Sequence, residues 1–163
     1  MKEQEITYFL ANIIIAVHYL NLGNIYHRDL KPANILMKKE SNGKTYLHLS
    51  DFGLAKNTRP DYTRDTTGLG DTKGTVEYMA PEILDTSKDK KPDYSKQDIW
   101  SIGVIAYKLC TQRLPFNRDE TMLKVSEMFN KPYVPISQDQ YSHDLIDVID
   151  RLLIKDPQQR LSI

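Results

Sequence analysis

The chain has 163 residues, of which 40% are hydrophobic, and its 22 basic and 22 acidic side chains give a formal net charge of zero. A protein built mainly to hold nucleic acid needs a basic excess for phosphate contacts, and a membrane-spanning helix needs an apolar run of ~20 residues; neither is present. A single cysteine, Cys110, excludes an intrachain disulfide and a cysteine-based zinc site. With no secretory signal after Met1, we expect a soluble cytoplasmic domain without nucleic-acid or membrane partners.

The first third of the chain predicts a helix followed by a hairpin. Apolar residues recur at three- and four-residue spacing from Glu5 onward, which defines one face of a helix, and Gly23 suits its end. Two β-like runs follow, at residues 35–37 and 46–49. The Asn42-Gly43 step between them favours a tight reversal, so we expect a small β-hairpin.

The remaining two thirds predict an irregular segment followed by helices. Residues 51–82 have no clear periodicity, which in a compact domain is typical of a functional or disordered segment. The segment 99–110 is apolar on nearly every side, which predicts a helix in the middle of the core, with Ser95 as its cap. A short helix is expected at about 120–129 and a final helix from Ser142 to Leu153. The predicted fold class is therefore mainly α, in an α+β arrangement.

The residues that could perform chemistry lie on both sides of the predicted hairpin. Asp29, Lys31 and Asn34 precede it, and Asp51 follows it, so a tight hairpin brings these groups together. Asn34 and Asp51 offer the hard oxygen ligands that Mg²⁺ prefers, alongside phosphates. Lys31 can neutralise phosphoryl charge, and Asp29 can accept a proton from an attacking hydroxyl. This combination predicts a phosphoryl-transfer site.

Four ordered motifs resemble those of the protein-kinase family. The run His27-Arg28-Asp29-Leu30-Lys31-Pro32-Ala33-Asn34 resembles its catalytic loop, and Asp51-Phe52-Gly53 resembles its metal-binding motif. Ala80-Pro81-Glu82 resembles the end of its activation segment, and 98–103 (DIWSIG) the start of its buried central helix. The similarity covers essentially the whole chain as the larger, helical lobe, and Lys31 and Thr75 match the serine/threonine branch.

The resemblance implies a role for each residue of the site. Asp29 would orient the substrate hydroxyl and take its proton, and Lys31 would contact the transferred phosphate of ATP. Asn34 and Asp51 would hold magnesium, and Leu36 would form the floor of the adenine pocket. The implied cofactors are thus ATP and Mg²⁺, and the implied substrates are proteins with Ser or Thr hydroxyls.

Other residues have structural roles in the same resemblance. His27 would pack against Phe52, and Glu82 would pair with Arg160. Asp98 would tie down the backbone of the catalytic loop. A second interpretation of Asp98 remains open, because it lies three residues after Ser95, the spacing of a helix capping box.

The segment before Thr75 is expected to regulate activity. Arg28 is the expected receiver of a phosphate from this segment, through charge-assisted hydrogen bonds. One hypothesis is that Asp71 supplies a permanent, weaker negative charge. We favour the other, in which Thr72 or Thr67 carries the phosphate, and this makes an upstream activating kinase an expected partner.

Features of the smaller kinase lobe are missing from the sequence: a glycine-rich strand turn, a strand lysine and its helix glutamate. We therefore expect residues 1–163 to be a partial kinase domain, the large lobe truncated at both ends. The first functional hypothesis is a Ser/Thr protein kinase whose isolated chain binds nucleotide weakly and turns over negligibly. The alternative is a catalytically inert fragment that acts as a binding or regulatory module, and a small-molecule phosphotransferase is a third, less favoured class. We also expect exposed apolar surface around Phe52 and the first helix, with poor solubility or self-association.

Overall fold

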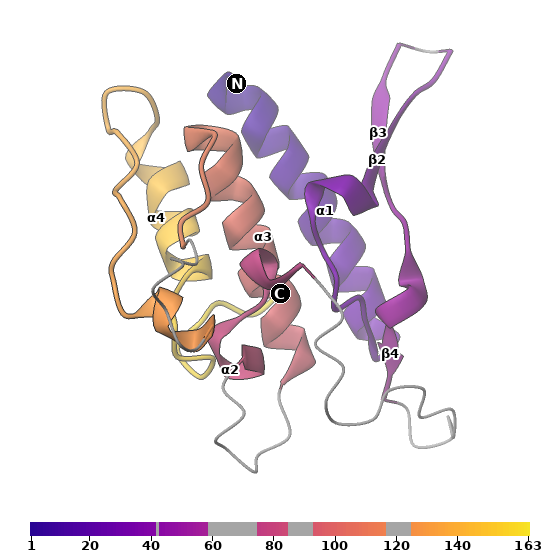
Figure 1. Cartoon of the computed structure of the whole chain (residues 1–163). Helices are drawn as coiled ribbons and strands as arrows, with labels where there is room; N and C mark the ends of the chain where they lie inside the picture. The colour runs from indigo at the N-terminus through magenta and orange to yellow at the C-terminus, as the bar shows by residue number, and fades with distance from the viewer. Residues whose placement is uncertain (42, 59–74, 85–92, 117–124) are drawn as a thin grey trace.

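The computed structural model describes residues 1–41, 43–58, 75–84, 93–116 and 125–163 (Figure 1). Its α-helices are α1 (Glu3–Leu22), α2 (Pro81–Leu84), α3 (Tyr94–Thr111) and α4 (His143–Leu152). Its strands are β1 (Ile25–Tyr26), β2 (Ile35–Lys39), β3 (Thr45–Leu49) and β4 (Lys56–Asn57). Short 3-10 helices lie at Pro32–Asn34, Phe52–Leu54, Val76–Tyr78 and Val125–Phe129. The described residues thus form a mainly helical domain with two small antiparallel sheets, as expected for its fold class.

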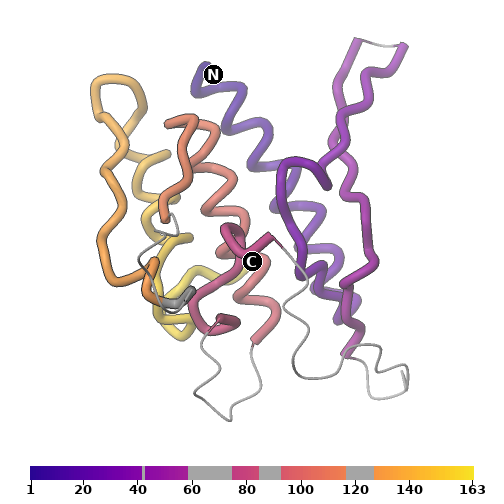
Figure 2. Tube along the Cα trace, in the orientation of Figure 1, coloured from indigo at the N-terminus to yellow at the C-terminus, as the bar shows by residue number. Residues whose placement is uncertain are grey.

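Helix α3 is the central element of the core, with α1 and α4 on either side of it (Figures 1 and 2). Because its sequence is apolar on nearly every side, residues around its whole circumference are buried, including Trp100 with no exposed surface. Gly103 lies at the crossing with α4, where an added Cβ would stand 2.9 Å from Leu152 Cβ. The close approach of these two helices therefore depends on a glycine at this position.

Helix α1 buries one face and exposes the other. Ile6, Leu10, Ile13 and Val17 pack in the core, as the spacing predicted. The opposite face carries exposed apolar side chains, among them Tyr19, which is 69% exposed. Among the described helices, α1 alone is long and apolar enough to cross a membrane, so the expectation that no apolar run reaches this length was wrong. Core helices of many domains share this property.

The predicted hairpin is confirmed as strands β2 and β3, which extend beyond the helices in Figure 2. Ile35 pairs with Leu49 at its base and Lys39 with Thr45 at its far end. Gly43 has a φ of +78°, which the turn requires and which glycine adopts without strain. The Asn-Gly signal in the sequence therefore identified the reversal correctly.

The second sheet, in which β1 pairs with β4, was not predicted. Each strand has only two residues, which is too short for any alternation of apolar and polar side chains to be visible. The sheet lies within the segments that flank the hairpin, and it gives regular structure to part of residues 51–82. That segment also contains helix α2, so the expectation of a wholly irregular stretch was wrong for its described residues.

Two helix boundaries also differ from the prediction. The cap of α3 is Asp93 rather than Ser95, because the Asp93 side chain accepts a hydrogen bond from the Ser95 backbone N–H at 3.0 Å. The helix consequently starts at Tyr94, so Asp98 lies inside it and not in a capping box with Ser95. Of the helix predicted at 120–129, the described part is the 3-10 helix Val125–Phe129, and residues 120–124 lie outside the described residues.

Candidate active site

Asp29 is the centre of a hydrogen-bonded group in the loop 27–34. Its carboxylate is 9% exposed and accepts a hydrogen bond from Lys31 Nζ at 2.7 Å. Asn34 Nδ2 donates both to the Asp29 carbonyl at 2.8 Å and to Asp29 Oδ2 at 3.0 Å. The Pro32–Asn34 turn brings Asn34 back toward Asp29, so one carboxylate oxygen is held by two side chains of its own loop.

The base of the hairpin brings Asp51 next to this group. The backbone N–H and the hydroxyl of Ser50 both donate to the Asn34 carbonyl, at 2.9 and 3.1 Å. Asp51 follows directly with a left-handed backbone (φ +61°), which is uncommon for a residue other than glycine. Its Oδ1 accepts a hydrogen bond from the Gly53 N–H at 3.3 Å, and a Cβ at Gly53 would crowd that oxygen at 3.1 Å.

The donor atoms of Asn34 and Asp51 fit a magnesium ion. Because Asn34 Nδ2 is directed at Asp29, its carbonyl oxygen points the other way and can serve as a ligand. Asp51 is exposed and directly follows Ser50, which is hydrogen-bonded to the Asn34 carbonyl. Within the described residues no group of three His, Cys, Asp or Glu side chains could hold a metal. Mg²⁺ is commonly bound by one or two protein oxygens together with substrate phosphates and water, so two donors suffice.

Asp98 holds the backbone of the loop from beneath. One of its oxygens accepts from the His27 N–H at 2.8 Å and the other from the Arg28 N–H at 2.9 Å. This is the contact that the kinase resemblance implied, and it replaces the capping interpretation. Asp98 has no exposed surface, and burial raises the pKa of its carboxyl from 3.8 to about 6, against the opposing effect of the two N–H donors.

His27 and Phe52 are in contact, as expected. Their ring centroids lie 4.9 Å apart, and the His27 side chain is fully buried. Its Nε2 lies 3.0 Å from the Ser50 carbonyl, an acceptor, which makes this nitrogen the protonated one. Burial lowers the pKa of the imidazole, with the hydrogen bond to Ser50 opposing it. His27 therefore joins the loop to the segment that carries Asp51.

Arg160 is buried and forms a bidentate ion pair with Glu82. Its terminal nitrogens donate to the two carboxylate oxygens at 2.6 and 2.9 Å. The guanidinium carbon lies 5.0 Å from the centre of the Trp100 ring. This pair joins the residue after Pro81, in α2, to the end of the chain, as the sequence had suggested.

Of the remaining predicted site residues, two are described and three are not. Leu36 is 54% exposed on β2, and the Thr75 N–H makes a long contact of 3.5 Å to Asp29 Oδ1. Thr67, Asp71 and Thr72 lie outside the described residues.

Three residues near the loop were missed by sequence reasoning: Lys56, Tyr94 and Gln97. Gln97 Nε2 donates to the Arg28 carbonyl at 2.8 Å, and Arg28 lies over the Tyr94 ring. For Tyr94 and Gln97, the available signal was their position four residues and one residue before Asp98 on a predicted helix. Lys56 approaches the same ring and lies on β4, which the sequence had not predicted.

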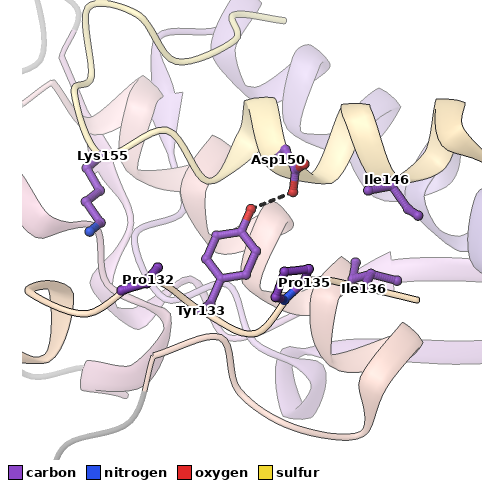
Figure 3. A pocket seen from close by; sticks show the side chains of 7 residues that line it. All are labelled: Pro132, Tyr133, Pro135, Ile136, Ile146, Asp150 and Lys155. Carbon is purple, nitrogen blue, oxygen red and sulfur yellow. Dashed lines mark hydrogen bonds between the residues drawn. The ribbon is translucent and has the colours of Figure 1, made fainter. Parts of the chain in front are cut away.

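A separate pocket of about 290 Å³ lies beside α4 and shares no residue with this site (Figure 3). In it Tyr133 donates a hydrogen bond to Asp150 at 2.6 Å, and burial, followed by the Asp150 carboxylate, raises the pKa of the phenol. The pocket is lined by Pro132, Tyr133, Pro135, Ile136, Ile146, Asp150 and Lys155. The wall of this pocket is mostly apolar and does not suit a phosphate, whereas the loop 27–34 offers the ammonium group of Lys31.

Comparison with known proteins identifies the family. The model of the protein kinase domain matches residues 1–163. The chain belongs to the protein kinase domain family. It is 36% identical over 162 residues to serine/threonine-protein kinase 17A of Oryctolagus cuniculus, covering 98% of this chain and 38% of that protein. It is 40% identical over 162 residues to developmentally-regulated protein kinase 1 of Dictyostelium discoideum, covering 98% of this chain and 20% of that protein.

A third relative, dual specificity protein kinase Ttk of Danio rerio, is 36% identical over 161 residues, 95% of this chain and 16% of that protein. The chain spans between 14 and 38% of the length of six such relatives. Proteins of this family are transferases that phosphorylate proteins and typically use ATP and magnesium.

Proposed function

We propose that the chain is the large helical lobe of a Ser/Thr protein kinase and that its 27–34 loop transfers the γ-phosphate of ATP to Ser or Thr hydroxyls. The observation that carries this proposal is the buried Asp29 carboxylate, held by Lys31 and Asn34, with Ser50, the residue before Asp51, hydrogen-bonded to the Asn34 carbonyl. Serine/threonine specificity is supported by Lys31 in the loop and by the names of several relatives.

Asp29 is the proposed general base. Its Oδ2 is engaged by Lys31 and Asn34, which leaves Oδ1, with one long contact from the Thr75 N–H, to accept the proton of a substrate hydroxyl. Because its partners are part of the same loop, the carboxylate is already oriented before the substrate arrives. General-base assistance of this kind contributes typically ~10²–10⁴-fold.

Lys31, Asn34 and Asp51 are the proposed phosphate and metal contacts. Lys31 is 23% exposed, so its ammonium group can neutralise charge on a phosphoryl group while it orients Asp29. Asn34 and Asp51 would hold magnesium, which when bound neutralises the negative charge of the nucleotide phosphates. The buried Asp98 and the His27–Phe52 contact keep the two sides of the hairpin at this site.

Metal–nucleotide binding by the full chain tests the site without requiring turnover. Mn²⁺ with ATP is added to ¹⁵N-labelled protein, and paramagnetic broadening is followed at the Asn34 side-chain amide and the Gly53 amide. We expect broadening centred on these two groups, at millimolar ATP because Leu36 is exposed, and its loss in Asp51→Ala. Asp139→Asn, an exposed carboxylate outside the site, is the matched control and should leave the effect unchanged. Broadening that persists in Asp51→Ala would refute the proposed metal site.

Phosphotransfer to Ser, Thr and Tyr peptides then separates the enzyme from the binding module. If the chain is catalytic, transfer goes to Ser or Thr peptides and falls ~10²–10⁴-fold in Asp29→Asn with nucleotide binding retained. Nucleotide binding with no transfer, in wild type and Asp29→Asn alike, would instead favour a regulatory module.

A further inference from the structure

The pocket beside α4 has walls that are fixed in the free protein (Figure 3). Tyr107 of α3 donates its hydroxyl to the Val134 carbonyl at 2.8 Å, and Tyr133 donates to Asp150 of α4 at 2.6 Å. The Tyr133 ring also packs edge-on against Tyr107 and Phe116, with ring centres 5.4 and 5.5 Å apart. Because these contacts fasten the segment that carries Tyr133 to two helices, the pocket is formed before a ligand arrives, which lowers the cost of binding.

Most of the lining is carbon surface. It comes from two prolines and two isoleucines, Pro132, Pro135, Ile136 and Ile146. Pockets that enclose small molecules have volumes of about 300–1,000 Å³, and this one, at about 290 Å³, lies at the lower limit of that range. The pocket therefore suits one large apolar side chain better than a cofactor.

The two charged residues of the lining differ in how far they are already engaged. Lys155 Nζ donates to the Phe129 carbonyl and lies 5.7 Å from the centre of the Phe116 ring. Asp150 is exposed, and its Oδ1 accepts the hydrogen bond from Tyr133. Among the described residues no lysine or arginine forms an ion pair with Asp150, and its Oδ2 accepts no hydrogen bond. Tyr133 thus orients a carboxylate that has one oxygen left for a partner.

The helix that carries this carboxylate is acidic. Three aspartates of α4, Asp144, Asp147 and Asp150, stand against one arginine, Arg151. Three negative charges less one positive charge give the helix a net charge of −2 with its histidine neutral. Arg151 lies 3.6 Å from Asp147, and the preceding segment 130–142 adds one lysine and one aspartate, so neither compensates Asp150. The charge that complements this side of the pocket is positive.

We propose that this pocket binds a linear segment of a partner protein, in which an aliphatic side chain packs against Ile136 and Ile146 and a nearby arginine pairs with Asp150. Arginine is the favoured cation because its guanidinium is weakly hydrated and matches a carboxylate in geometry. Tyr133 is a positioning residue, since its hydroxyl holds the carboxylate that receives the arginine. The pocket shares no residue with the loop 27–34, so this inference does not depend on the proposed function.

Titration of the full chain with synthetic peptides tests the proposal, with ¹³C-labelled isoleucine methyl groups as the readout. Acetylated and amidated peptides place an arginine one, two or three positions before or after a leucine in a glycine–serine background. We expect saturable shifts of the Ile136 and Ile146 methyl resonances with at least one peptide, at a dissociation constant on the order of 1 mM. Glutamate in place of the arginine should weaken binding about 5- to 30-fold. Alanine in place of the leucine should weaken it about 10-fold or more.

Variants of the protein separate local pairing from overall charge. Asp150→Lys should reverse the preference, so that the glutamate peptide binds more tightly than the arginine peptide. Tyr133→Phe should weaken the arginine peptide about 2- to 5-fold and leave a glutamine-substituted peptide unchanged, which a purely structural role of Tyr133 would not do. Asp144→Asn removes the same charge from α4 at an exposed residue outside the pocket. It is the matched control and should change the affinity less than about twofold at physiological ionic strength.

Three results would overturn the proposal. The first is the absence of shifts at Ile136 and Ile146 with every peptide up to about 10 mM. The second is equal affinity for the arginine and glutamate peptides, and the third is an arginine preference that survives in Asp150→Lys. Peptide binding here needs neither nucleotide nor turnover, so failure of phosphotransfer would count against the proposed function alone.

Discussion

Replacement of Arg160 by lysine should destabilise the fold strongly, because the guanidinium uses all five of its N–H donors. Two donate to Glu82 at 2.6 and 2.9 Å, and the other three donate to backbone carbonyls. Those carbonyls belong to Ile154, Lys96 and Lys155, at 2.8, 2.7 and 3.1 Å. A lysine ammonium has three donors at most, so at least two of these acceptors lose their partner.

The expected cost follows from the burial of the pair. The Arg160 side chain has no exposed surface and that of Glu82 is 15% exposed, so water cannot replace the lost donors easily. Disrupting a buried ion pair typically costs ~3–5 kcal/mol, and domains have about 5–15 kcal/mol of stability in total. For a domain of this size, Arg160→Lys should therefore lower the thermal midpoint by about 6–20 °C. Glu82→Gln keeps one oxygen acceptor and should cost less.

Urea unfolding followed by circular dichroism measures these free energies. Arg113→Lys, at an exposed arginine, is the matched control and should change stability by no more than about 0.5 kcal/mol. The double variant Glu82→Gln/Arg160→Lys should lose less than the sum of the single losses, because the two residues are in direct contact. A loss below about 1 kcal/mol in Arg160→Lys would refute the argument that its five hydrogen bonds are structurally required.

Three further expectations follow from single contacts. The pKa of the Asp98 carboxyl rises from 3.8 to about 6 on folding, so between these values the folded protein keeps the carboxyl protonated and the unfolded chain does not. The stability that Asp98 contributes is therefore fully present below about pH 4 and is lost as the pH rises through 6. The free energy of unfolding of wild type should therefore fall relative to Asp98→Asn by roughly 3 kcal/mol between pH 4 and 7, and parallel pH profiles in urea would contradict this. Gly103→Ala should cost ~1–3 kcal/mol in calorimetry, because the new methyl group would stand 2.9 Å from Leu152 Cβ; an unchanged melting midpoint would show that α4 moves freely. Tyr133→Phe should cost about 0.5–1.5 kcal/mol in urea unfolding through loss of the hydrogen bond to Asp150, and a cost that persists when Asp150 is also replaced by alanine would point to packing instead.

Local patterns in the sequence were sufficient to predict several parts of the molecule. The spacing of apolar residues predicted α1 and α4, and the continuous apolar segment predicted the buried α3. The Asn42-Gly43 step predicted the hairpin, whose base joins the segments that carry Asn34 and Asp51. In each case the signal lies within a few residues of chain, where backbone periodicity and turn preference act directly.

Tertiary structure alone decided the contacts that join distant segments. Asp98 could have capped its own helix, and only the fold brings its carboxylate to the N–H groups of His27 and Arg28, 71 and 70 residues away. The β1–β4 sheet and the approach of two cations to Tyr94 likewise had no counterpart in any local pattern. Such contacts depend on how whole helices and strands pack, because a buried polar group must find its partner wherever packing places one. The regulatory assignments of Thr67, Asp71 and Thr72 remain predictions from the sequence.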